Sequence, residues 1–471
     1  MIILGTNSIK ATGFDVANSV RFNRGSSDRL NRTPSSTGNR KNWTWSSWIK
    51  RSTLGSKNII FGSFENTDFS NYINLFFTTA NKIELQNVSS GSNTGAFTTD
   101  RVFRDPSAWF HLLLEVDTTE STASDRIKLY INGQRETNLS STSNPSLNED
   151  LQLNISGRSF EIGAFNSSEY FDGYMSEVVL LDSTSADNSS FGEFDSDSGI
   201  WKPIDVSGLT FGTNGFYLDF EDSSALGNDA AGSNNFTVNN LTAIDQSIDS
   251  CTNNFATLNP LNVPTSNAPT FSEGNLQSIS SSSASGAFGG SSTIGVSSGK
   301  WYIETKCLTS GHNQSSVGVT YNDAETARVN SGGTLGYEYS YRMNGNKGHD
   351  NTDSSYGDTY TTNDIIGIAL DLDNNKIYFS KNGTFQNSGN PESGSTGTGA
   401  AFTVDSGQTY MFYHQDNTGA SSNTSSVSFN FGSPAYSESG GNSDADGYGN
   451  FKTAPPSGYF ALNTKNLAEY G

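Results

Sequence analysis

The sequence is poor in cysteine and has no long apolar run. Its 471 residues include two cysteines, Cys251 and Cys307, whose separation fits neither a zinc site nor a redox motif. No stretch of 18 apolar residues occurs, which excludes a membrane-spanning helix. The first ten residues, MIILGTNSIK, lack the basic start of a signal peptide. We therefore expect a protein that folds in a reducing cytoplasm.

Positive charge is also scarce. The chain has 27 lysine and arginine residues against 48 aspartate and glutamate residues, a net charge of −21 at pH 7. No segment clusters enough lysine and arginine to displace counterions from a phosphate backbone or to bind an anionic membrane surface. The sequence therefore predicts no nucleic acid partner and no membrane partner, and it predicts a solvated acidic surface.

Patterns for metal binding are few. The four histidines, His111, His312, His349 and His414, show no metal-type spacing. The segment DADGYGN (444–450) is similar to a calcium loop but lacks the later bidentate glutamate, so we expect a turn there. We predict no metal site and no cofactor.

One segment has the pattern of a catalytic strand. EVDTTE (115–120) resembles the E-x-D-x-x-E strand of laminarinase-type glucanases, in which one carboxylate is the nucleophile and another the acid. Alternation would place Glu115 and Asp117 on one face of a strand. Glu120 would join them only across a bulge, and the polar residues that follow predict a loop. We therefore predict no catalytic residue and no enzyme, with glycan depolymerase as the least favoured alternative.

What the sequence does contain is a hairpin that occurs twice. In NDIIGIALDLDNNKIYFSKNG (363–383), apolar residues recur at every second position from Ile366 to Leu372, with Asp371 and Asp373 on the opposite face, toward water. LLLEVDTTESTASDRIKLYING (112–133) has the same plan. Each copy ends in Asn-Gly, which favours a tight turn. Each also follows a tryptophan, Trp45 or Trp301, by a similar distance, which indicates two domains of one architecture.

The composition favours strands with aromatic cores. Phe, Tyr and Trp make up 12% of the residues, too many for a disordered chain, and we find no long amphipathic helix. Trp43 and Trp45 fall on one strand face and Trp48 on the other, and we expect at least two of them in the core. We predict an all-β fold of two concanavalin A-like jelly-roll β-sandwiches joined by a packed connector.

Two regions carry family resemblances. Residues 19–182 resemble a laminin G-like domain through WTWSSWIKR, WFHLLLEVD, LYINGQ and YFDGYMSEVVLLD. Residues 255–436 resemble a SPRY domain through GKWYIETK, the 363–383 hairpin and SVSFNFG. Both resemblances imply a jelly roll. We assign 1–18 to an N-terminal leader or anchor, 183–254 to the connector and 437–471 to a C-terminal segment.

A polar segment follows three tyrosines in the SPRY-like region. Tyr337, Tyr339 and Tyr341 alternate, and the residues after them are expected to form a long loop. Because SPRY domains bind partners through loops at one edge of the sandwich, the resemblance implies a binding role there. The candidate ligand-binding residues are Arg342, Asn346, Asp353 and Tyr356.

The pairing of these two domains, together with the start TGFDVANSVRFNRGSSDRLNRT, resembles virion proteins predicted in tailed phages, particularly marine ones. The resemblance implies a non-enzymatic structural protein of the virion, made in the host cytoplasm. We expect a fibre or receptor-binding protein that contacts other virion proteins of the tail or capsid and a host-surface glycan or protein. We also expect a homo-oligomer, a trimer, anchored by the leader. A head-decoration or capsid-fibre protein is the alternative.

Overall fold

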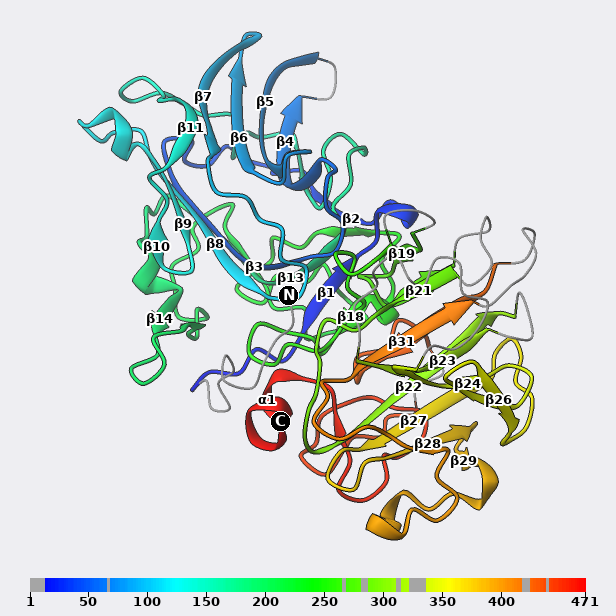
Figure 1. Ribbon diagram of the computed structural model, residues 1–471. Helices are drawn as coiled ribbons and strands as arrows, with labels where there is room; N and C mark the ends of the chain where they lie inside the picture. Colours follow the sequence, from blue (N-terminus) through cyan, green and yellow to red (C-terminus); the bar gives the residue numbers. More distant parts are fainter. Residues whose placement is uncertain are drawn as a thin grey trace. The chain divides into compact units, whose positions relative to one another are not determined.

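The computed structural model describes residues 13–65, 68–264, 268–280, 287–310, 315–321, 336–416, 424–437 and 440–471. The described residues divide into two compact units, 13–252 and 253–471 (Figure 1). The all-β prediction is confirmed, since α1 (Thr464–Tyr470) is the one α-helix in the described ranges. Those ranges contain no helix that is long and apolar enough to cross a membrane.

The first unit is a sandwich of two antiparallel sheets. The sheet that contains the 112–133 hairpin, here called the hairpin sheet, has the order β10-β9-β8-β3-β13-β1-β18, with β16 also paired to β13. These strands are β1 (Ser19–Phe22), β3 (Asn42–Arg51), β8 (Phe110–Asp117), β9 (Ile127–Ile131), β10 (Gln134–Arg135), β13 (Gly173–Asp182), β16 (Phe216–Leu218) and β18 (Gln246–Ser247).

The facing sheet of the first unit has the order β11-β7-β6-β5-β4-β12-β2-β17. Its strands are β2 (Arg29–Arg32), β4 (Asn58–Glu65), β5 (Asp68–Phe77), β6 (Ile83–Ser89), β7 (Ser92–Thr99), β11 (Leu139–Ser143), β12 (Ser159–Ile162) and β17 (Thr237–Asn239). The two-stranded β14 (Gly192–Phe194) and β15 (Trp201–Pro203) form a separate ribbon. Four 3₁₀ turns, η2 (Arg24–Ser26), η3 (Ala123–Asp125), η4 (Asn188–Ser190) and η5 (Ala243–Asp245), lie between strands.

The core of the first unit follows from alternation along the strands. Trp43 and Trp45 are fully buried between the two sheets, and the Trp45 ring lies 4.5 Å from the Phe61 ring. Trp48 is buried on the other face of β3, with its ring 5.1 Å from that of His111. The prediction that at least two of these tryptophans are core residues is confirmed.

The segment predicted as a connector is integral to the first unit. It supplies β16, β17 and β18 to the two sheets. It also covers the outer face of the hairpin sheet, where a second apolar cluster combines sheet residues with residues of the segment: Leu113, Val179, Leu181, Phe191, Val206 and Tyr217. The hairpin sheet is therefore buried on both faces.

The second unit repeats this plan. Its hairpin sheet, which contains the 363–383 hairpin, has the order β19-β20-β32-β22-β27-β28-β29. In addition, β30 pairs with β28, and β33 pairs in parallel with β22. The strands are β19 (Thr270–Ser272), β20 (Gln277–Ile279), β22 (Lys300–Thr309), β27 (Ile365–Asp371), β28 (Lys376–Lys381), β29 (Thr384–Phe385), β30 (Phe402–Thr403), β32 (Ser426–Asn430) and β33 (Phe460–Ala461).

The facing sheet of the second unit has the order β21-β31-β23-β24-β25-β26. Its strands are β21 (Ala287–Ser291), β23 (Ser316–Thr320), β24 (Glu338–Arg342), β25 (Asn346–His349), β26 (Thr352–Ser355) and β31 (Met411–Asp416), and two 3₁₀ turns, η6 (Gln386–Ser388) and η7 (Pro391–Thr396), follow β29. Fully buried residues of both sheets, including Trp301 and Phe412, form one core.

The C-terminal segment covers the outer face of this hairpin sheet. The Phe451 ring lies 5.2 Å from the Tyr302 ring, and the Glu304 carboxylate accepts the backbone N–H groups of Lys452 and Thr453 at 2.8 Å each. Beyond β33, α1 places Leu467 in the core. The segment 437–471 is therefore part of the sandwich.

One prediction for the 363–383 hairpin differs from the structure. Asp373 is exposed, but the prediction that Asp371 faces water is wrong, because the Asp371 side chain is fully buried. Its carboxylate accepts the backbone N–H and the side-chain amide of Asn374, both at 2.9 Å, and lies 3.4 Å from the Lys300 ammonium. These contacts satisfy the buried charge.

Candidate functional site

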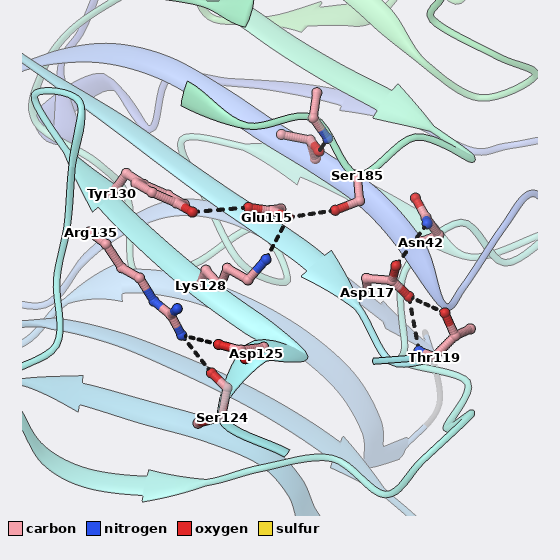
Figure 2. A network of polar contacts seen from close by, with 12 residues as sticks. Asn42, Glu115, Asp117, Thr119, Ser124, Asp125, Lys128, Tyr130, Arg135 and Ser185 are labelled. Atoms are coloured by element: carbon pink, nitrogen blue, oxygen red, sulfur yellow. Dashed lines mark hydrogen bonds and ion pairs between the residues drawn. The ribbon is translucent and has the colours of Figure 1, made fainter. Parts of the chain in front are cut away.

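The glucanase-like segment forms a closed polar cluster at the end of β8 (Figure 2). The Glu115 carboxylate accepts hydrogen bonds from Ser185 Oγ at 2.7 Å and Tyr130 OH at 3.2 Å, and lies 2.9 Å from Lys128 Nζ. Burial and the Glu115 charge raise the pKa of Tyr130 to about 12, so the phenol remains a donor at neutral pH. Both carboxylate oxygens are engaged.

The other two carboxylates of the segment do not complete a catalytic pair. Asp117 turns back on its own loop and accepts the backbone N–H and hydroxyl of Thr119 at 2.9 Å and 2.6 Å (Figure 2). Glu120 follows β8 in the loop, as the sequence predicted. Glycosidases need one carboxyl group to give up a proton and a second to face the sugar, and the contacts of this cluster instead hold strands together.

The four residues predicted to bind a ligand lie in the facing sheet of the second unit. Arg342 ends β24 and is buried, with its guanidinium 2.8 Å from the carboxylate of Asp353 on β26. Asn346 begins β25 and is half-buried. The predicted long loop is therefore a three-stranded meander for much of its length. Arg342, Asn346 and Asp353 come together on that meander, and their binding role stays a prediction.

Tyr356, the fourth residue, lies apart from that group in the core. Its ring centroid is 5.6 Å from that of Tyr341, and its hydroxyl accepts the Phe379 backbone N–H at 3.4 Å. Burial raises the pKa of Tyr356 to about 12. Tyr339 and Tyr341 are likewise buried. These contacts indicate that the three tyrosines pack in the core.

The acidic turn at 444–450 also has a structural explanation. The Asp444 carboxylate accepts hydrogen bonds from the backbone N–H groups of Asp446 at 3.0 Å and Tyr448 at 2.9 Å. It also accepts the backbone N–H of Ala461 at 2.9 Å and the side-chain amide of Asn466 at 2.8 Å. It thereby ties the turn to β33 and α1. Within the described ranges, no three His, Cys, Asp or Glu residues are grouped to hold a metal ion.

A pocket of about 430 Å³ lies in the first unit, between the open edges of its two sheets. β9 and β10 line it from the hairpin sheet, β7 and β11 line it from the facing sheet, and η3 adds Ser124 and Asp125 to the lining. The Arg135 guanidinium lies 2.7 Å from the Asp125 carboxylate and donates to the Ser124 carbonyl at 2.8 Å (Figure 2). This pocket is not predicted from the sequence, in which the long polar loop between Asp117 and Ile127 is the one feature that points to it.

A second pocket, of about 240 Å³, lies farther along β9 in the same unit. Leu129 lines the first pocket and Ile131 the second, two residues along the strand. The partly exposed indole of Trp109 forms part of its wall. Arg101 of the second pocket lies 3.4 Å from Glu136 of the first, so one ion pair joins the two.

Two family models match the chain. Residues 24–187 match the laminin G-type model of the concanavalin A-like lectin/glucanases superfamily. Residues 300–432 match the SPRY domain model. Both regions agree with the resemblances seen in the sequence, and both end before the segments that cover the hairpin sheets.

Comparison with individual proteins adds partial matches. The ATP-dependent RNA helicase DDX1 of Xenopus laevis is 35% identical over 92 residues, which are 20% of this chain and 12% of the helicase, so the chain spans a small part of that relative. The SPRY domain of human HERC1 is 20% identical, with 33% of this chain and 87% of that chain covered and a TM-score of 0.26.

A heptameric SAP-like pentraxin of Limulus polyphemus is 14% identical, with 37% of this chain and 79% of that chain covered and a TM-score of 0.28. The two family models carry the assignment. The lectin-like and SPRY matches suggest a binding function. The chain therefore combines a laminin G-like domain of concanavalin A type with a SPRY domain.

Proposed function

We propose that this chain is a non-enzymatic surface protein of a tailed-phage virion that attaches the particle to a host-surface glycan or protein. The observation that carries the proposal is the presence of two binding domains in one chain. The engagement of Glu115 and Asp117 by neighbouring groups supports the non-enzymatic part. The resemblance of the whole arrangement to phage virion proteins supports the location.

The proposal includes the assembly of the protein on the particle. A trimer presents several weak sites at once, and linked sites can exceed the affinity of one site by roughly 10²–10⁴. The leader would supply the contact with tail or capsid proteins. Residues 1–12 of that leader lie outside the described residues, whereas Val16 is buried and donates its N–H to Thr252 Oγ1 at 3.0 Å within the first unit.

The direct test uses particles of the phage that encodes this chain. Gold-labelled antibody against the protein is expected at the tail fibres, and the purified chain is expected to reduce adsorption of particles to host cells. Label on the head shell would favour a decoration role instead. An absence of label from particles would overturn the proposal.

A truncation tests the anchor separately. Deletion of residues 1–12 should leave both units folded, because their sheets begin later, and should abolish incorporation into particles. Circular dichroism of the truncated protein controls for folding. Normal occupancy on particles would show that the anchor lies elsewhere in the chain.

A further inference from the structure

We infer that the two pockets along β9 form one groove that binds an uncharged oligosaccharide. This inference rests on the proposed attachment function and names the ligand class of the first unit. The larger pocket, at about 430 Å³, falls within the range of about 300–1,000 Å³ that is usual for small-molecule sites. The groove lies at the edges of the two sheets and borders the Glu115 cluster, because Lys128 of its lining pairs with Glu115 at 2.9 Å.

The lining of the first pocket combines apolar and polar side chains, which suits a sugar ring. Sugars present C–H faces and hydroxyl groups on the same molecule. Phe97, Leu129 and Leu139 supply apolar lining, while Thr142, Ser143 and Asn144 of the opposite edge supply hydroxyls and an amide. Each of these polar groups can both donate and accept a hydrogen bond.

The charges of the first pocket balance. Its lining holds two acidic residues, Asp125 and Glu136, and two basic residues, Lys128 and Arg135. Each is in an ion pair: Asp125 with Arg135 at 2.7 Å, Glu136 with Arg101 at 3.4 Å and Lys128 with Glu115 at 2.9 Å. A ligand with charge of its own would lack a free counter-charge there. The net charge of −21 also disfavours the approach of acidic glycans.

The second pocket offers a fixed aromatic surface. Trp109 Nε1 donates to the Asp249 carboxylate at 2.9 Å, and that carboxylate lies 2.7 Å from Lys50 Nζ with both charged side chains buried. This buried pair fixes the orientation of the indole, which is partly exposed at the pocket wall. A preorganised aromatic ring loses little entropy when a sugar packs on it. Trp109 would therefore serve a second sugar unit.

The test is calorimetric titration of the full chain with defined oligosaccharides. The probes are the neutral maltohexaose, cellohexaose and mannohexaose, their disaccharides, and an acidic alginate hexasaccharide. We expect at least one neutral hexasaccharide to bind, more tightly than the alginate. Binding of no neutral probe, or tightest binding of alginate, would overturn the inference.

Variants locate the site. Thr142→Trp fills the first pocket and should abolish binding, whereas Ser141→Trp, on the same strand and outside the pocket lining, should leave it unchanged. Arg135→Ala should weaken binding at least about tenfold by removing a charged donor. Unchanged affinity in both Thr142→Trp and Arg135→Ala, with folding checked by circular dichroism, would exclude this groove.

Ligand length tests the second pocket. Trp109→Ala should lower the affinity for the hexasaccharide about threefold to tenfold and leave that for the disaccharide unchanged. Equal effects on both lengths, or none, would exclude a second subsite. If the chain competes with particles for host cells but binds no neutral sugar, this inference fails and the attachment function stands. If it binds sugar without competing, the groove stands and the attachment function fails.

Discussion

The hairpin sheets of the two units have the same strand order. The first runs β10-β9-β8-β3-β13-β1 and the second β29-β28-β27-β22-β32-β20, each antiparallel throughout. Trp45 on β3 pairs with Leu114, and Trp301 on β22 pairs with Leu370. Both tryptophans are fully buried. A short repeated hairpin thus marks a repeated architecture.

The Asn-Gly turns at one end of the two hairpins are also alike. Asn132 and Asn382 both have φ of 49°, and the glycines after them have φ of 74° and 89°. Asn132 Oδ1 accepts the N–H of His111 at 2.7 Å, and Asn382 Oδ1 accepts that of Ile365 at 2.9 Å. Each asparagine therefore fixes the start of the strand opposite it.

The other end of the hairpin differs, and the difference explains the pocket. In the second unit a short turn joins β27 to β28, held by Asp371. In the first unit residues 118–126 form a longer loop, which Arg126 braces by donating to the carbonyls of Glu120, Ser121 and Pro145. The longer loop ends in η3, which lines the pocket. In the first unit the longer loop thus contributes part of the pocket lining.

The largest effects are expected from removing the central tryptophans. Trp45→Ala and Trp301→Ala should each lower the free energy of unfolding of their own unit by about 3–5 kcal/mol, because each leaves a cavity between two sheets. Hydrogen exchange measured by mass spectrometry reports each unit separately. If one substitution lowered the protection of both units equally, the two cores would not be independent of each other.

A pH dependence should distinguish the units. Burial raises the pKa of Glu177, on β13, to about 8, although its carboxyl group accepts the Tyr217 hydroxyl at 2.7 Å. The folded state therefore holds a proton that the unfolded state releases near pH 4.5. Because the native state binds more protons over this range, stability falls as the pH rises toward 8.

Between pH 6.5 and 8 the first unit should lose up to about 2 kcal/mol of stability. Denaturant titrations with unit-resolved hydrogen exchange measure this slope, and Glu177→Gln should flatten it. Below pH 6.5 the second unit should lose stability, because burial lowers the pKa of His414 to about 4, so unfolding takes up a proton. In the first unit burial lowers the pKa of His111 to about 3, but the proton that His111 takes up on unfolding is offset by the one that Glu177 releases, so stability should stay nearly constant down to about pH 4.5. If the stability of the first unit still falls between pH 6.5 and 8 in Glu177→Gln, another group causes the pH dependence.

The two turns should respond equally to one substitution. Asn132→Ala and Asn382→Ala should each lower the free energy of unfolding by about 1–2 kcal/mol, since alanine disfavours positive φ and removes the side-chain hydrogen bond. Thermal unfolding measures the loss. Effects that differ by more than about twofold would show that the turns are alike in geometry only.

The smallest effect is expected at the glucanase-like segment. Glu120→Gln should change stability by less than about 0.5 kcal/mol, as usual for a surface site. Glu115→Gln should cost more, because Lys128 loses its charged partner. Neither substitution should alter any activity on polysaccharide. A hydrolytic activity lost in either variant, measured by reducing-sugar release, would contradict the non-enzymatic assignment.

Local features of this fold could be predicted from the sequence. Alternation of apolar residues identified the hairpin strands, and Asn-Gly identified their turns, because both depend on neighbouring residues. The position of Tyr356 could not be predicted, since it follows from packing against Tyr341 and Phe379 on other strands. The groove could not be predicted for the same reason, because edge strands of two different sheets line it and the sequence does not show that these strands lie together.

The covers of the two hairpin sheets have a consequence for how such units can be inherited. The family-matched regions end at residues 187 and 432, but Phe191 and Val206 in one unit and Phe451 in the other pack on the sheets from beyond those ends. A recombinant gene joined at the ends of the matched regions would leave apolar sheet faces in water. Exchange between genomes should therefore preserve each sandwich together with its cover, with the junction near residue 252.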